Sequence, residues 1–323
     1  MIIDTHAHFT PQSMLDALKK KISQFPSVEM LVNDDTYKLG FAGGELTRPI
    51  SHKLREVDLR LDWMGEQCID AQINGGWLDS FGYELPAEEG AAWSRFLNEF
   101  LMSGTERHKA LIPLATVPLQ NGKLSAKVLE EALKAGFTGV MIGTQPHGNS
   151  GNLDDPDLDP FWEAASSLNA TLYLHPMFGC GDPRLLDYGM MNAIGRGVDT
   201  SIAISRLLFS GHFLKYPGMT FVLSHGGGAL PYMLGRLARN AEIPGHEYAD
   251  PLLGFKTLYF DTVLFDPKAL NFLRNVVGAE KIMLGSDYPF PIGDPNPLKI
   301  VKSTNLSETE TNLILGDTAA INF

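Results

Sequence analysis

The chain has 323 residues, of which 44% are hydrophobic, and a formal net charge of −12. This length and apolar content allow a large core, and α/β barrels often reach such a length as one domain. The acidic balance, without a cluster of lysines and arginines, argues against a nucleic-acid or membrane partner but permits a small acid bound by one arginine. Two cysteines cannot form a disulfide framework, and no apolar stretch reaches transmembrane length, so we expect a cytoplasmic protein.

Apolar runs alternate with helix-like segments along the chain. The expected strands cover residues 1–9, 68–74, 110–117, 138–143, 171–175, 220–224, 258–262 and 281–286. The expected helices cover residues 54–66, 88–102, 124–135, 160–168, 200–213, 230–241, 267–276 and 308–320. Eight strands, each followed by a helix, predict an α/β fold, a single (β/α)8 TIM-barrel domain over residues 1–323. A doubly wound sheet is the alternative, but it requires a glycine-rich phosphate turn after the first strand, where two histidines stand instead.

The segment between the first strand and its helix, residues 10–51, is longer than an ordinary loop. Loops of such length are usually functional or disordered. The sequence Phe-Ala-Gly-Gly-Glu at residues 41–45 provides glycines that can act as hinges. The pattern predicts a lid or a small insertion over the mouth of the barrel.

The first strand ends in the sequence Asp-Thr-His-Ala-His. Side chains alternate along a strand, so His6 and His8 point to the same face. Two adjacent imidazoles are costly to bury without a partner, and they provide half of a metal site. This pair therefore directs the search for further ligands to the ends of the other strands.

Three further candidate groups stand at strand ends, which is where barrel enzymes gather their catalytic groups. His175 ends the fifth strand, His225 the sixth and Asp287 the eighth. Three imidazoles and one carboxylate suit zinc or a similar divalent ion, with one position open for water or substrate. A single strand-end histidine is more often a hydrogen-bonded core group, and we keep such ordinary roles for the remaining histidines, which are His52, His108, His147, His212 and His246.

These motifs resemble those of the amidohydrolase superfamily, and within it the branch of metal-dependent decarboxylases typified by 2-amino-3-carboxymuconate-6-semialdehyde decarboxylase. Besides the His-x-His pair, the resemblance is carried by residues 174–176, 224–232, 259–262 and 285–290. It implies that His6, His8, His175 and Asp287 bind the metal. It also implies that His225 stands beside the metal and transfers protons together with Asp287.

The fourth strand bears on the number of metal ions. Amidohydrolases with two metals usually bridge them with a carboxylated lysine or a glutamate at the end of this strand. Residues 138–145 read Thr-Gly-Val-Met-Ile-Gly-Thr-Gln and contain neither. The resemblance therefore implies one divalent ion per subunit, most simply Zn²⁺, with Mn²⁺ and Mg²⁺ as alternatives. It also implies a homodimer, which is the commonest assembly of soluble proteins.

A small acid as substrate needs a cation to hold it, and arginine binds carboxylates bidentately. Arg236 lies where the related enzymes carry a substrate-binding arginine, although a surface pair with Glu242 explains it equally well. Arg48, in the long segment, and Arg196, after the fifth strand, are further candidates. Three aromatic residues at strand ends can stack on a planar substrate or simply pack in the core, namely Trp77, Phe178 and Phe290.

The resemblance implies non-oxidative decarboxylation of a small aromatic or muconate-type carboxylic acid. A metal ion beside a histidine suits two alternatives equally well. One is a hydrolase, such as a lactonase or an amidohydrolase, and the other is a hydratase acting on a small cyclic or unsaturated acid. A non-catalytic protein with a structural zinc fits least, since such sites are normally closed by four Cys or His ligands.

Overall fold

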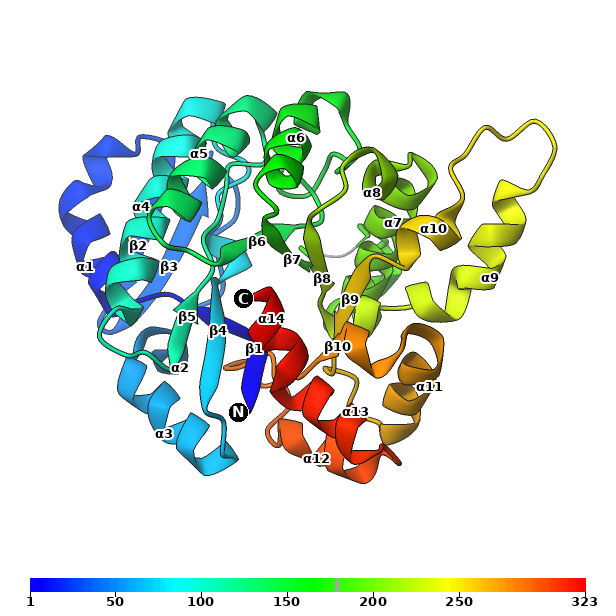
Figure 1. Cartoon of the computed structure of the whole chain (residues 1–323). Coiled ribbons are helices and arrows are strands. Elements are labelled where there is room, and N and C mark those ends of the chain that lie inside the picture. The colour runs from blue at the N-terminus through cyan, green and yellow to red at the C-terminus, as the bar shows by residue number, and fades with distance from the viewer. Residues whose placement is uncertain (178–179) are drawn as a thin grey trace.

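The computed structural model describes residues 1–177 and 180–323, which form a barrel of parallel strands surrounded by helices (Figure 1). In chain order the barrel strands are β1 (Ile3–Phe9), β4 (Ala71–Gly76), β5 (Leu111–Pro113), β6 (Gly139–Gly143), β7 (Thr171–His175), β8 (Thr220–Leu223), β9 (Leu258–Asp261) and β10 (Ile282–Met283). Each of the eight predicted strands is present. The structure therefore confirms the (β/α)8 barrel.

Two runs of hydrogen-bonded strands meet to close the barrel. β1, β4 and β5 form one run, and β6 to β10 form the other. At one seam Ala115, just after β5, pairs with Val140 in β6. At the other seam Ala7 in β1 pairs with Tyr288, which follows β10. This second seam places the end of the first strand beside the end of the last.

Helices cover the outside of the barrel. They are α2 (His52–Arg55), α3 (Val57–Gln67), α4 (Ala87–Thr105), α5 (Gly122–Lys134), α6 (Asp159–Ser167), α7 (Arg196–Phe209), α8 (His212–Lys215), α9 (Leu230–Ala241), α10 (Pro251–Phe255), α11 (Pro267–Val277), α12 (Pro297–Ser303) and α13 (Glu308–Asn312). The last helix, α14 (Thr318–Asn322), lies instead at the N-terminal ends of the strands, where Asn322 accepts hydrogen bonds from Thr171 and Thr220 (Figure 1). The helix predicted over 200–213 is divided because Gly211 adopts the left-handed conformation that ends helices. Within the described ranges, none of the helices has the length and apolar character that crossing a membrane requires.

Residues 10–51 form an ordered insertion. Helix α1 (Gln12–Lys21) precedes an antiparallel hairpin of β2 (Val28–Asn33) and β3 (Thr36–Phe41). The insertion packs on the outside of α4, where the rings of Phe25 and Phe41 lie 5.2 and 5.7 Å from that of Trp93. Its C-terminal end, at Arg48, lines the cavity at the mouth of the barrel. The lid function stays a prediction, and it concerns only this end of the insertion.

A buried carboxylate joins the first strand to its neighbours. Asp4 in β1 accepts hydrogen bonds from the Ser286 hydroxyl at 2.6 Å, the Ser286 amide at 3.0 Å and the Gln72 side chain at 2.8 Å. Burial raises the pKa of Asp4 to about 6, although these hydrogen bonds work in the opposite direction. Asp4 thus holds β1 against both β4 and the segment after β10.

A fully buried arginine fixes the end of β1. Arg60 on α3 donates to the backbone carbonyl of His8 and to the side-chain oxygens of Gln72 and Asn74, the last two at 2.7 and 2.6 Å. Its guanidinium lies 4.8 Å from the ring centroid of Tyr288. Across the described part of the chain, Arg60 forms no direct ion pair, so its hydrogen bonds go to neutral oxygens and its guanidinium packs against aromatic faces.

The substitution Arg60→Ala removes these hydrogen bonds and leaves buried oxygens unsatisfied around a cavity. We expect the free energy of unfolding to fall by about 3–5 kcal/mol, since both effects cost a few kcal/mol each. Urea unfolding followed by circular dichroism measures the loss. Arg95→Ala is the matched control, because Arg95 pairs with Glu131 on the surface and such pairs contribute about 0–1 kcal/mol. Equal losses in the two variants would contradict the structural role of Arg60.

Candidate metal centre

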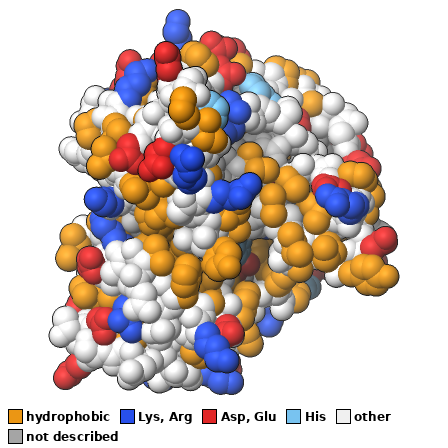
Figure 2. All heavy atoms as spheres, turned by 90° about the vertical axis from the view of Figure 1, so that its right-hand side faces the viewer, with side chains coloured by type: hydrophobic (Ala, Val, Ile, Leu, Met, Phe, Trp, Pro, Cys, Tyr) orange, Lys and Arg blue, Asp and Glu red, His pale blue; other side chains and the backbone are white. Residues whose placement is uncertain are grey.

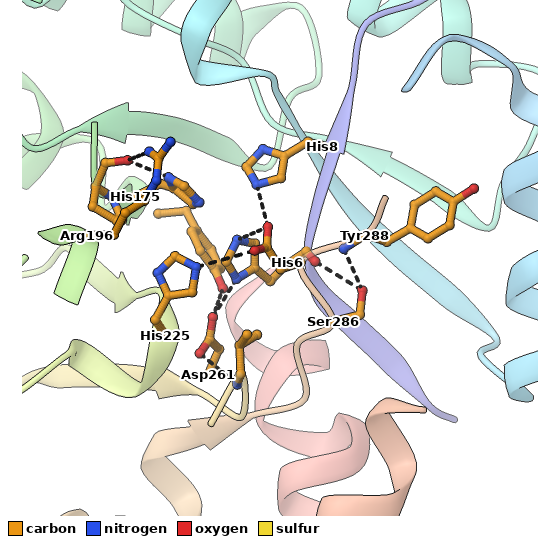
Figure 3. Close-up of polar contacts among 12 residues, drawn as sticks. His6, His8, His175, Arg196, His225, Asp261, Ser286 and Tyr288 are labelled. Carbon is orange, nitrogen blue, oxygen red and sulfur yellow. Dashed lines mark hydrogen bonds and ion pairs between the residues drawn. The ribbon is translucent and has the colours of Figure 1, made fainter. Parts of the chain in front are cut away.

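Five polar side chains converge at the C-terminal ends of the barrel strands, and Figure 3 shows the four histidines pointing toward one another. His6 and His8 come from β1, His175 ends β7, His225 follows β8 and Asp287 follows β10. The ring centroid of His6 lies 5.2 Å from those of His8 and His175 and 5.1 Å from that of His225. The structure therefore brings together all five residues that the sequence placed at strand ends.

Asp287 lies among these imidazoles. Its Oδ1 is 3.3 Å from Nε2 of His8 and 3.5 Å from Nε2 of His6, and its Oδ2 is 3.6 Å from Nε2 of His225. Burial alone would raise the pKa of Asp287, but the neighbouring imidazoles hold it well below its usual range. The carboxylate is therefore ionised, which is the form that binds a metal.

The two loop-borne members of the group have unusual backbone conformations. His225 has a φ of 54° and Asp287 a φ of 60°, in the left-handed region that non-glycine residues rarely adopt. Strained residues of this kind cluster at functional sites. The glycines after His225 serve close packing, since a Cβ at Gly228 would lie 2.3 Å from the carbonyl oxygen of Gly197 on α7.

In three of the histidines, the protein holds one ring nitrogen and leaves the other without a partner. The held atom is Nδ1, which lies near an oxygen in each case, at 2.6 Å for His6 and Asp261 Oδ2, 3.1 Å for His8 and the Gly76 carbonyl, and 2.8 Å for His175 and the Pro176 carbonyl. Because these oxygens only accept, each Nδ1 carries the proton and each Nε2 presents its lone pair.

Besides Nδ1 of His225, four buried atoms in this group make no hydrogen bond of good geometry among the described residues. They are Nε2 of His6, His8 and His175, and Oδ1 of Asp287. Buried polar atoms normally form hydrogen bonds, so atoms that have a lone pair and no partner indicate that something else binds there. Three imidazole nitrogens and one carboxylate oxygen are a suitable ligand set for a divalent cation, and the site is a divalent metal site.

His225 is arranged differently from the other three histidines. Its side chain is 20% exposed, whereas those of His6 and His8 are fully buried. Its Nε2 faces Asp287, and its Nδ1 has no partner in the parts of the chain that the structure describes. By distance alone His225 also fits as a ligand, because potential ligand atoms of His6, His175, His225 and Asp287 all lie within 4.8 Å of one another.

The pKa values of the buried imidazoles follow from their surroundings. Burial and the neighbouring imidazoles lower the pKa of His175 well below its usual value, and burial also lowers that of His8. Burial acts in the same direction on His6, but Asp287 and Asp261 outweigh it and raise the pKa. His8 and His175 are thus held neutral, as metal ligands must be.

Asp261 is a site residue to which the sequence motifs assigned no role. It ends β9, and its Oδ2 lies 2.6 Å from Nδ1 of His6 and accepts from the Tyr173 hydroxyl at 3.0 Å. Its Oδ1 accepts from the Gly226 amide at 2.8 Å, which also positions the loop of His225. Carboxylates behind a histidine orient the ring and strengthen its binding to metals. The sequence did contain one indication of this role, because Asp261 lies at the end of a predicted strand.

A cavity of about 620 Å³ opens above the metal group. Trp77 and Phe290, two of the predicted aromatic residues, both line it. The guanidinium of Arg48 lies 5.6 and 5.7 Å from their ring centroids, and its Nη2 is 3.1 Å from Asp79. The cavity therefore combines apolar walls with charged groups near its rim, as sites for small organic ligands usually do.

The structure does not place the other two predicted substrate-binding residues, Arg236 and Phe178, at this cavity. Arg236 is exposed on α9 and does not line this cavity. Glu242, its expected partner, instead lies 3.5 Å from Arg239. Phe178 lies outside the described residues. The substrate-binding roles of Arg236 and Phe178 therefore stay predictions.

The fold and the site together define a barrel protein with a divalent metal site at the C-terminal ends of its strands. Residues 3–321 match the family model described as amidohydrolase. The chain belongs to the amidohydrolase family.

Several known proteins are similar over nearly the whole chain. The 2-amino-3-carboxymuconate-6-semialdehyde decarboxylase of Dictyostelium discoideum is 29% identical, over 98% of this chain and 90% of that protein. The crystal structure of 5-carboxyvanillate decarboxylase from Sphingomonas paucimobilis has a TM-score of 0.83 and 24% identity, and the match covers 100% of this chain and 98% of that chain. Dihydroxybenzoic acid decarboxylase from Polaromonas sp. JS666, solved with manganese and 2-nitroresorcinol, has a TM-score of 0.79 and 22% identity, over 99% and 96% of the two chains.

The substitution Asp261→Asn tests the support that the metal centre receives from β9. Loss of the carboxylate removes the charge behind His6, and we expect the affinity for a divalent metal to fall about 10–100-fold. Competition with a chromogenic chelator measures the affinity. Asp62→Asn, an exposed position on α3, is the control and is expected to bind like the wild type. Unchanged affinity in Asp261→Asn would show that this contact does not support the site.

Proposed function

We propose that this protein is a metal-dependent non-oxidative decarboxylase, a carboxy-lyase that acts on a small aromatic or muconate-type carboxylic acid. The observation that carries the proposal is the set of four unsatisfied buried atoms at the floor of a cavity with aromatic walls. The activities named for the similar proteins support it, since all three are decarboxylases.

We further propose that His6, His8, His175 and Asp287 hold one divalent ion, most simply Zn²⁺, with Mn²⁺ and Mg²⁺ as alternatives. The support is that each of these four residues contributes one unsatisfied buried atom, while the unsatisfied atom of His225 is Nδ1 and its Nε2 faces Asp287. When bound, such an ion supplies Lewis-acid polarisation of substrate oxygens. The end of β6 carries Gly143 and Thr144 and offers no lysine or glutamate for a second ion.

His225 is placed to move the proton that the reaction requires. Decarboxylation breaks the bond between the carboxyl group and the adjacent carbon, and that carbon must gain a proton as carbon dioxide leaves. His225 lines the cavity and is partly exposed, so it can exchange protons with solvent and deliver one to the substrate. Asp287, 3.6 Å away, orients the imidazole.

The cavity walls are proposed to position the substrate. Trp77 and Phe290 offer faces on which a planar ring can stack. Arg48, between these rings, can orient an acidic group of the substrate, which contributes to the rate through position more than through chemistry.

The proposed roles of His8 and His225 predict that substituting His8 lowers the metal content and that substituting His225 does not. The wild type is expected to bind about one equivalent of metal, measured by elemental analysis after dialysis. His8→Gln is expected to lose most of it, whereas His225→Gln is expected to keep it and lose turnover. Two tightly bound equivalents, or metal loss in His225→Gln alone, would contradict these assignments.

The reaction type is tested by the products. The metal-loaded protein is expected to release one carbon dioxide per molecule of an accepted aromatic or muconate-type acid, and chelation of the metal is expected to abolish the release. A parallel panel of lactones, amides and unsaturated acids tests the hydrolase and hydratase alternatives, which yield acid or a hydrated product without carbon dioxide. Turnover of that panel alone would favour those alternatives.

We also propose a homodimer. Figure 2 shows hydrophobic side chains spread over the face that α9, α10 and α11 form. Exposed members of these helices include Tyr232, Met233, Leu252, Leu253 and Phe272. An apolar surface of this kind is typical of an interaction site. Analytical ultracentrifugation is expected to give twice the mass of one chain, and a monomer at micromolar concentration would contradict the proposal.

A further inference from the structure

Arg196 is a cation on the wall of the metal cavity, and among the described residues it forms no direct ion pair. It begins α7, is half-buried and lines the same cavity as the metal group. Its Nη1 donates to the carbonyls of Pro176, at 2.9 Å, and Met177, and its Nε donates to Asn192 at 3.1 Å. Within residues 1–177 and 180–323, Nη2 makes no hydrogen bond and the guanidinium forms no ion pair.

Arg48 borders the same cavity but differs in one respect. Its Nε and Nη2 lie 3.3 and 3.1 Å from the carboxylate of Asp79, so its charge is already compensated. Arg196 is held only by neutral oxygens. The carboxylates of Asp79, Asp287 and Asp199 act on its charge from a greater distance. A partly desolvated guanidinium without a direct ion pair favours the binding of an anion beside it.

Hydrogen bonds between α7 and the segment after β7 fix the position of Arg196. Asp199, one turn further along α7, accepts from the Met177 amide at 3.2 Å, from the Gln145 side chain at 2.9 Å and from the Thr144 hydroxyl. Helix α7 therefore holds the segment after β7, and the carbonyls of that segment hold the guanidinium. A side chain ordered in this way loses little conformational freedom when it binds a ligand.

Arg196 also lines two cavities. It lines a second cavity of about 920 Å³ as well as the metal cavity, so it stands where the two cavities adjoin. Figure 3 shows it beside His175, with its guanidinium near the backbone that follows β7. A substrate whose reacting carboxyl group lies at the metal would present its far end to this region.

We propose that Arg196 binds a second carboxylate of the substrate, remote from the one that reacts, and that the protein therefore selects dicarboxylic over monocarboxylic acids. This inference rests on the proposed function for the placement of the reacting carboxyl group. A monocarboxylic acid would leave the guanidinium unpaired in a partly desolvated cavity, and unpaired buried groups are a strong source of discrimination.

Binding of inert probes to the Mn²⁺-loaded protein tests this proposal by calorimetry. The probes are benzoate, isophthalate and terephthalate, whose two carboxylates are too far apart to chelate one ion. The wild type is expected to bind at least one of the two dicarboxylates about 10-fold or more tighter than benzoate, the gain expected for a hydrogen bond to a charged group. Arg196→Met is expected to lose this preference while its affinity for benzoate changes little.

Two further variants keep the test decisive. Arg206→Met, on the same helix, removes a surface pair with Asp154 and is expected to keep the wild-type preference. Arg196→Lys retains the charge and is expected to keep part of the preference, even if Arg196→Met fails to fold. No preference in the wild type, a preference that survives in Arg196→Met, or none in a folded Arg196→Lys would overturn the proposal. Absence of carbon dioxide release together with an Arg196-dependent preference would remove the proposed function and leave only the selection of dicarboxylic acids by Arg196.

Discussion

The seam between the first and the last barrel strands is the contact on which the metal centre depends. The amide of Asp287 donates to the carbonyl of His6 at 2.8 Å, and Ala7 pairs with Tyr288 beside it. Asp4 reinforces this seam, since its carboxylate accepts from Ser286, which is 282 positions away in the chain. Because side chains alternate along β1, closing the seam in this register places His6 and His8 on the same side as Asp287. A slip of one residue would turn both imidazoles away from it.

The metal centre also depends on the protein oxygens that lie within hydrogen-bond distance of Nδ1 in His6, His8 and His175. Asp261 and two backbone carbonyls fix three rings so that their remaining nitrogens converge. These atoms are costly to bury unsatisfied, and they gain their partner when a cation binds. His225 lies at the edge of this group and lines the cavity, and its side chain is more exposed than those of His6 and His8. The chemistry thus depends on differences in exposure among residues of the same type.

The sequence predicted the barrel and the five converging residues because both depend on local patterns. Strand alternation, apolar runs and the rule that barrel sites lie at strand ends need no knowledge of distant contacts. Arg60 could not be predicted in this way, since its spacing on α3 does not distinguish a surface arginine from one buried against Gln72 and Asn74. The lack of a direct ion pair at Arg196 likewise depends on the other partners that Asp79 and Asp199 bind. The hairpin within residues 10–51 did have a local signal, because the Asp34-Asp35 turn lies between two runs of strand-forming residues.

Anomalous diffraction from crystals of the metal-loaded protein tests the central claim most directly. If the ring arrangement is that of a single metal site, one peak per chain should lie about 2.0–2.2 Å from Nε2 of His6, His8 and His175 and from Oδ1 of Asp287, with His225 outside the coordination sphere. Two peaks at the site, or one peak bound through His225 with His8 unligated, would contradict it.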